Sequence, residues 1–167
     1  MIELRPFEES HLPEVLGWVN SDAVRDTIGT VRPVSMTEHR RWYERVQGDP
    51  TRLTLVIHDA ESNAPRGLIG LTGIDPVYRN AEVWLYLGEA GAQRRGHGRA
   101  ALLAMVGLAF DTLNLHRVYA HVFDSNEPAR RFFVACGFRE EGRLREAVFK
   151  KGRWVDKHVL GLLAHER

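Results

Sequence analysis

The sequence contains a single cysteine, Cys136, among 167 residues. One thiol has no partner for an internal disulfide, and a zinc site built from several cysteines is excluded as well. The eight histidines show neither HxxxH nor HExxH spacing, so we predict no metal site. We predict that Cys136 is a small buried residue rather than an acyl-enzyme nucleophile, because no histidine and acid can be placed beside it.

Long apolar runs and an excess of either charge are also missing. The apolar segments are far shorter than the roughly 20 residues that span a membrane, and residues 1–5 alternate like a strand instead of resembling a secretion signal. We therefore expect a cytoplasmic protein with no membrane partner. A formal net charge of +1 gives no general attraction to nucleic acid, and the one basic segment, 94–99, lacks interleaved aromatic residues. No nucleic-acid partner is predicted.

The patterns that are present predict one domain over residues 1–167. Alternation and turn signals predict strands at 1–7, 53–59, 67–75, 81–88, 116–123, 143–150 and 153–164. Helical periodicity predicts a helix capped by Ser10, another that begins with the capping box of Ser35 and Glu38, a long helix at 98–113 and a short one after Asn126. This order predicts an α+β fold with a mixed, mostly antiparallel sheet of about seven strands, about four helices and one central parallel βαβ unit.

The most informative segment runs from Gln93 to Ala100, between a strand and the long helix. Glycines allow main-chain N–H groups to turn inward, and a helix start adds partial positive charge, so the segment suits a diphosphate. A surface turn with incidental arginines is the plainer alternative. A Walker A loop is excluded, because His97 and Gly98 stand where lysine and serine or threonine are needed. A dinucleotide site fits the glycines as G-x-G-x-x-A, but only one βαβ unit is present.

Gln93, Gly96 and Gly98 resemble the pyrophosphate signature of the GNAT N-acyltransferases, Q/R-x-x-G-x-G/A. A register shifted to Arg95, Gly98 and Ala100 also fits. Asn126, with the later Cys136-Gly137-Phe138, is similar to the N-x-x-A…GF segment of that family, and the order of elements matches its fold throughout. The subgroup that the chain resembles most contains the polyamine, amino-sugar and ribosomal-protein N-terminal acetyltransferases. The resemblance implies a GNAT-like fold and an acetyl-CoA-dependent N-acetyltransferase without a metal.

The resemblance also implies a set of site residues. The main chain near Leu87 would polarise the thioester carbonyl, and Asn126 would contact coenzyme A. The pyrophosphate would lie on Gln93, Arg94, Arg95, Gly96, His97, Gly98 and Arg99. The candidate catalytic base is Glu82, acting directly or through water; the alternative is a carboxylate that only faces solvent. Many relatives have a tyrosine as the acid where this chain has Phe133, which cannot donate a proton. Coenzyme A could instead leave with the help of water, and Tyr86 and Tyr119 are fallback donors.

The acceptor is expected to be a small-molecule or peptide amine. Residues 27–34 contain Arg32 and no acid, whereas a polycation site should contain carboxylates. Arg25 and Arg32 suit an acceptor that bears phosphate or carboxylate, such as a nucleotide amino sugar. A protein α-amine is an alternative acceptor, and an acyl-CoA-sensing domain with weak catalysis is a further alternative. A sheet edge beside 153–164 would allow a homodimer.

Overall fold

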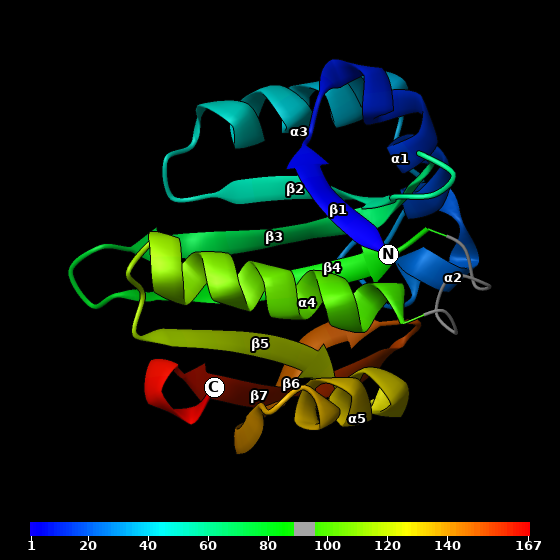
Figure 1. Ribbon diagram of the computed structural model, residues 1–167. Helices are drawn as coiled ribbons and strands as arrows, with labels where there is room; N and C mark the ends of the chain where they lie inside the picture. The colour runs from blue at the N-terminus through cyan, green and yellow to red at the C-terminus, as the bar shows by residue number, and fades with distance from the viewer. Residues whose placement is uncertain (89–95) are drawn as a thin grey trace.

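The computed structural model describes residues 1–88 and 96–167. Seven strands form one sheet in the order β1-β2-β3-β4-β5-β7-β6. These strands are β1 (Ile2–Pro6), β2 (Leu53–Asp59), β3 (Pro65–Asp75), β4 (Asn80–Leu87), β5 (Arg117–Phe123), β6 (Arg139–Lys150) and β7 (Arg153–Leu163). All neighbours are antiparallel except β4 and β5, which are parallel (Figure 1). The predicted mixed sheet with one parallel pair is confirmed.

The described residues form five α-helices: α1 (Leu12–Asn20), α2 (Asp22–Arg25), α3 (Met36–Gly48), α4 (His97–Gly107) and α5 (Glu127–Ala135). Helix α3 begins with the predicted capping box, in which Ser35 and Glu38 each accept a main-chain N–H of the other. Ser10 does not cap the first helix, because a short 3-10 turn, Glu9–His11, precedes α1. Helix α4 ends earlier than predicted and continues as a π-helical segment, Leu108–Thr112.

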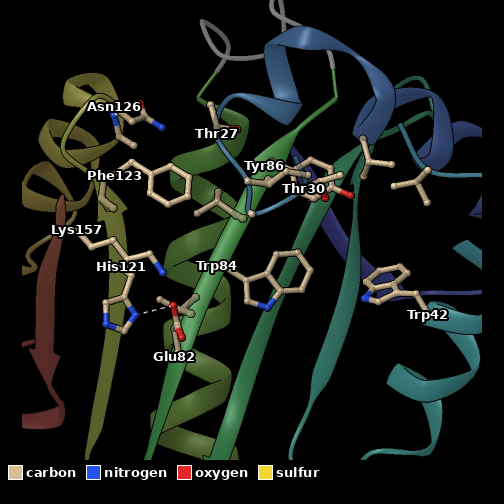
Figure 2. A pocket seen from close by; sticks show the side chains of 18 of the residues that line it. Thr27, Thr30, Trp42, Glu82, Trp84, Tyr86, His121, Phe123, Asn126 and Lys157 are labelled. Atoms are coloured by element: carbon tan, nitrogen blue, oxygen red, sulfur yellow. Dashed lines mark hydrogen bonds and ion pairs between the residues drawn. The ribbon is translucent and has the colours of Figure 1, made fainter. Parts of the chain in front are cut away.

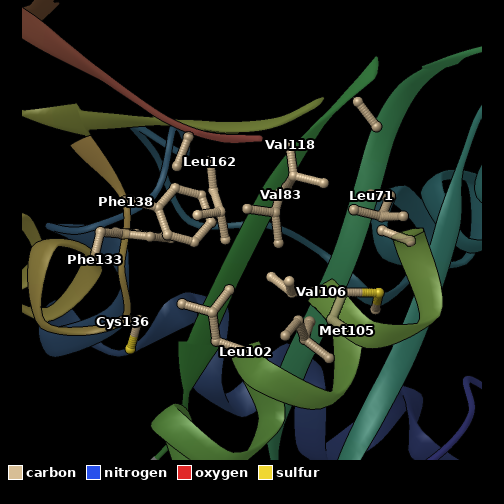
Figure 3. Packing of buried hydrophobic residues seen from close by; sticks show 14 of the residues in the cluster. Leu71, Val83, Leu102, Met105, Val106, Val118, Phe133, Cys136, Phe138 and Leu162 are labelled. Carbon is tan, nitrogen blue, oxygen red and sulfur yellow. The ribbon is translucent and has the colours of Figure 1, made fainter. Parts of the chain in front are cut away.

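The larger hydrophobic core lies between the sheet and helices α4 and α5 (Figures 1 and 3). Leu102 and Met105 of α4 are fully buried against Val83 of β4. Beyond α5, Phe138 is 2% exposed, and its ring packs edge-on against Phe133 with centroids 5.1 Å apart. Burying a side chain of this size stabilises the fold by about 1.5–3 kcal/mol. Cys136 is buried in the same core, as predicted.

The opposite face of the sheet carries α1, α2 and α3 and a second core that includes Val15, Val56 and Leu68. Trp84 of β4 packs beside this core with its indole flat against β3, opposite Gly70. A Cβ at Gly70 would lie 2.5 Å from that ring, so glycine alone leaves room for the indole there. The Trp84 indole therefore covers part of the sheet surface on this face.

Strand β6, which begins at Arg139, is one edge of the sheet, while β7 lies between β5 and β6. The edge beside 153–164 is therefore β6, whose residues are almost all exposed. No helix within residues 1–88 and 96–167 has both the length and the apolar character needed to cross a membrane.

Candidate active site

The two parallel strands separate at the centre of the sheet. β4 and β5 pair only from Asn80 opposite Arg117 to Glu82 opposite Tyr119, although both strands continue for several residues beyond that point. The main chain from 83 to 87 consequently has strand partners in β3 but none in β5. The predicted carbonyl contact near Leu87 lies at the end of this opening.

Two cavities, of about 580 and 540 Å³, meet at the opening. We call the first the α3 cavity, because it extends to His39 and Trp42 of α3. The second, the α4 cavity, extends to the N-terminus of α4 at Gly96 and Gly98. The two cavities share the lining residues Thr27, Leu85, Tyr86, Asn126, Ala129 and Phe133. This arrangement brings two separate binding spaces into contact at the unpaired part of β4.

The α4 cavity has the features of a phosphate site. Gly96 has a φ of 74°, the left-handed conformation that glycine adopts without strain, and α4 begins immediately after it. The first N–H groups of a helix have no partner within the helix and carry partial positive charge, so they attract anions. Of the predicted cofactor residues, Leu87, Gly96, Gly98, Arg99 and Asn126 line this cavity. Gln93, Arg94 and Arg95 lie outside the described residues.

The predicted roles of His97 and Asn126 become more specific. The His97 side chain is buried and faces Asp59, with Nε2 3.8 Å from Oδ2. Since this side chain is not part of the cavity lining, only the His97 main chain is available to a phosphate. The Asn126 amide oxygen accepts the N–H of Ala129 at 3.2 Å and caps α5. That bond fixes the Asn126 amide and leaves its nitrogen as a donor for a ligand.

Replacing Gly98 with alanine should weaken the binding of coenzyme A without destabilising the fold. Inside the protein the new methyl group would meet nothing closer than 3.7 Å, and alanine favours a helix. We expect an unchanged or slightly higher melting temperature and a roughly 10-fold weaker affinity for coenzyme A, measured by calorimetry. Gly107→Ala, at the far end of α4, is the control and should leave affinity unchanged. An unaltered affinity in Gly98→Ala would mean that Gly98 does not face the coenzyme.

In the α3 cavity, Glu82 of β4 meets His121 of β5, with Oε1 2.9 Å from the ring Nδ1 (Figure 2). Both side chains are partly exposed to the cavity, 33% for Glu82 and 24% for His121. A carboxylate only accepts hydrogen bonds, so Nδ1–H is the donor, and a ring with a single proton then has its lone pair at Nε2. We call this pair the dyad. Sequence reasoning missed His121, because only the parallel register of β4 and β5 brings the two residues together.

The remaining tyrosine donors hold their protons firmly. Burial raises the pKa of Tyr86. Burial and the nearby charge of Glu82 raise the pKa of Tyr119. Phe133 is 6% exposed, belongs to the core and lines both cavities. Burial likewise raises the pKa of the Cys136 thiol, and Cys136 does not line either cavity.

The arginines that suggested an anionic acceptor are engaged elsewhere. Arg25 pairs with Asp22 and does not line the α3 cavity. Arg32 does line it, but pairs with Glu38 and, with Ser35, lowers the pKa of that carboxyl to about 2. The expectation for Arg25 was therefore wrong, and the charge of Arg32 is largely offset. The cavity has three further cationic residues that sequence reasoning did not connect with it: Arg45, Arg52 and Lys157.

The family described as acetyltransferase (GNAT) domain matches residues 2–139 of this sequence. The chain belongs to the GNAT acetyltransferase family. It is accordingly an acetyl-CoA:amine N-acetyltransferase, and acetyl-CoA is its cosubstrate. Among the residues that the structure describes, no group of three histidine, cysteine or acidic side chains is arranged to hold a metal ion.

Known relatives resemble this GNAT chain in sequence and structure. A spermidine N(1)-acetyltransferase of Vibrio cholerae is 33% identical over 122 residues, which cover 73% of this chain and 69% of the relative. The crystal structure of spermidine N-acetyltransferase from Vibrio cholerae in complex with CoA and spermine has a TM-score of 0.92 at 27% identity, covering 99% of this chain and 96% of the other. A putative ribosomal N-acetyltransferase of Bacillus subtilis is 31% identical over 100 residues, or 60% of this chain and 54% of the relative.

Proposed function

We propose that this enzyme acetylates a primary amine of a small anionic molecule, for which a nucleotide amino sugar is an example, by direct attack in a ternary complex. The observation that carries the proposal is the pair of cavities that meet beside the dyad. Acetyl-CoA would extend from the N-terminus of α4 toward Leu87, and the acceptor would occupy the α3 cavity. Because Cys136 is buried away from both cavities, an acyl-enzyme intermediate has no support.

The dyad gives this reaction a base. The amine nitrogen would attack the thioester carbonyl, the C–S bond would break, and the amine proton would pass to Nε2 of His121. Glu82, 2.9 Å from Nδ1, would stabilise the resulting imidazolium, as a carboxylate does in other histidine-based catalysts. Glu82 then acts through His121 rather than directly or through water.

The leaving thiolate has no obvious acid among the described residues that line the opening. Phe133 has no proton to donate, and the raised pKa values of Tyr86 and Tyr119 make them weak donors. A thiol similar to cysteine has a pKa near 8.5, so a thiolate is a tolerable leaving group close to neutral pH. We propose that coenzyme A departs as the thiolate and takes its proton from water.

The charges of the α3 cavity favour an anionic acceptor. Its lining includes four cationic side chains, Arg32, Arg45, Arg52 and Lys157, and two carboxylates, Glu38 and Glu82. Glu38 pairs with Arg32, Glu82 with His121, and Arg52 with Asp49. Arg45 and Lys157 are the lining cations with no ion pair among the described residues. A polyamine would find no free carboxylate in this lining and two unpaired like charges, which repel it. We therefore do not carry over the spermidine activity of the relatives.

A protein α-amine is the second candidate acceptor. It is supported by the Bacillus subtilis relative, which bears the name of a putative ribosomal N-acetyltransferase. A peptide α-amine, with a pKa of about 7.7–8.0, also needs less help from a base than an alkylamine does. We further propose a cytoplasmic location and a homo-oligomer; a solved relative is described as dodecameric.

An amine panel tests the proposed function. Release of the coenzyme A thiol would be measured with nucleotide amino sugars, short peptides with free N-termini, and spermidine. We expect kcat/KM for the best anionic amine to exceed that for spermidine at least about 10-fold, a difference of about 1.4 kcal/mol. A preference for spermidine would overturn the anionic acceptor. Protection by coenzyme A against thermal unfolding, with no turnover of any amine, would favour a sensing domain instead.

A further inference from the structure

Lys157 of β7 is a cation without a counter-ion in the α3 cavity. Its side chain is half-buried, and Nζ lies 5.7 Å from the centre of the Phe123 ring. Within the described residues, Lys157 makes no ion pair or hydrogen bond. The nearby carboxylates have other partners, because Asp156 binds Arg143 and Asp124 binds His158. Among the described residues, the face of the Phe123 ring is therefore the contact that this ammonium has, and no carboxylate opposes it.

An anionic ligand could supply the counter-charge that Lys157 lacks in this cavity. A charge removed from water loses hydration free energy, which an opposite charge or hydrogen bonds must offset. On the same hairpin, Lys151 has a carboxylate within reach in Asp26, and Arg143 has one in Asp156. Lys157 differs in facing the space where the acceptor would bind.

The register of the sheet places Lys157 near the dyad. β5 and β7 are antiparallel, with Phe123 opposite Lys157 and His121 opposite Val159. His121 and Lys157 are therefore diagonal neighbours on one face, about 7–8 Å apart between Cα atoms. Figure 2 shows the Lys157 side chain extending past Phe123 toward His121 and Glu82. An anion at Nζ and an amine at Nε2 of His121 would thus be only a few bonds apart.

The position of Lys157 fits the acceptor better than the coenzyme. Lys157 lines the α3 cavity but not the α4 cavity, which contains Gly96, Gly98 and Arg99. A lysine placed to bind the pyrophosphate should instead lie along the α4 cavity. The acceptor cavity is thus the space in which the charge of Lys157 acts.

We propose that Lys157 binds an anionic group of the acceptor, a carboxylate or phosphate separated by a few bonds from the amine that is acetylated. This inference rests on the proposed function and narrows its substrate class to short amino acids, aminoalkyl phosphates and amino sugar phosphates. The same ammonium repels the second amine of a polyamine. Lys157 is then a specificity residue that distinguishes this chain's acceptor from a polyamine.

Matched pairs of amines that differ in one anionic group test the inference. The pairs are glucosamine 6-phosphate with glucosamine, aminoethyl phosphate with ethanolamine, and β-alanine with its amide; spermidine is added as the polycation. For the native enzyme we expect the charged member of at least one pair to have a kcat/KM about 10-fold above its neutral partner. Lys157→Met should bring this ratio close to one through a higher KM, with the KM of acetyl-CoA unchanged.

Three further variants complete the test. Lys157→Arg should keep the preference for the charged amine, and Lys157→Glu should lose that amine and gain activity on spermidine. Arg131→Met removes a cation that is 80% exposed on α5 and lies outside both cavities, so it should change nothing. If Lys157→Met keeps the native preference, the assignment of Lys157 is overturned while the proposed function stands. If the native enzyme releases no thiol with any amine, the proposed function fails, and the inference fails with it.

Discussion

Replacing His121 with alanine is expected to lower kcat/KM about 100-fold, the usual contribution of a general base. The reason is that Nδ1 of His121 is held by Glu82 at 2.9 Å, which leaves Nε2 to accept the amine proton. The KM of acetyl-CoA should not change, because His121 lines only the α3 cavity. Steady-state kinetics with the best acceptor of the panel would measure both effects.

The pH profile distinguishes a base from a merely structural contact. Native kcat/KM should fall as the pH is lowered, because both the attacking amine and a general base must be unprotonated to act. His121→Ala should lose the part of this decline that comes from the ring, and Glu82→Gln should lower turnover by a smaller factor with the ring still present. Tyr119→Phe, next to the dyad, is the control and should retain most activity. Native turnover and an unchanged profile in His121→Ala would remove the histidine from the mechanism.

Much of the fold follows from local patterns in the sequence. Alternating apolar residues predicted all seven strands, and the serine-to-glutamate spacing at residues 35–38 predicted the start of α3, because these signals depend on neighbours along the chain. The cap at Ser10 was wrong for a similar local reason: the chain forms a 3-10 turn first, and Pro13 lies in the first turn of α1. Boundaries depend on a few hydrogen bonds that the pattern does not determine.

The candidate site was less predictable, because it depends on contacts between distant segments. Glu82 was found from its strand, but its partner His121 is 39 residues away. The segment between α2 and α3 is another example: Lys150 Nζ, at the end of β6, donates to the carbonyl oxygens of Arg25, Asp26 and Ile28 at 2.9, 2.7 and 2.8 Å. These bonds hold Thr27 between the two cavities. Neither the Glu82–His121 contact nor the Lys150 contacts can be predicted from the spacing of residues along the chain.

The cationic side chains were also only partly predictable from the sequence, because their partners in space were not known. Arg32 lines the α3 cavity but Arg25 does not, and the carboxylate partner of each arginine was not foreseen. Lys157 had no such signal in the sequence, since it lies in an ordinary alternating strand. Its importance comes from what surrounds it in space. A charge is informative about function only once its partners are known.

Replacing Phe138 with alanine should have the largest effect on stability, a loss of about 3–5 kcal/mol of unfolding free energy. The ring is 2% exposed and packs against Phe133, so truncation leaves a hole between the sheet and α5 as well as the lost burial. Phe133 lines both cavities, and the same change should therefore widen the junction and raise the KM of both substrates. Denaturant unfolding and steady-state kinetics would measure the two effects.

Phe149→Ala is the matched control for that prediction. Phe149 is 56% exposed and touches Trp154 on the outer hairpin, so its removal should cost about 1 kcal/mol or less. Both variants remove the same ring, so the difference between their unfolding free energies measures the effect of burial alone. If both variants lost a similar amount of unfolding free energy, the buried packing of Phe138 would not be an important source of stability. If Phe138→Ala lost the expected unfolding free energy but kept native KM values, the core packing would not control the shape of the cavities. Phe133 would then keep its position without the contact from Phe138.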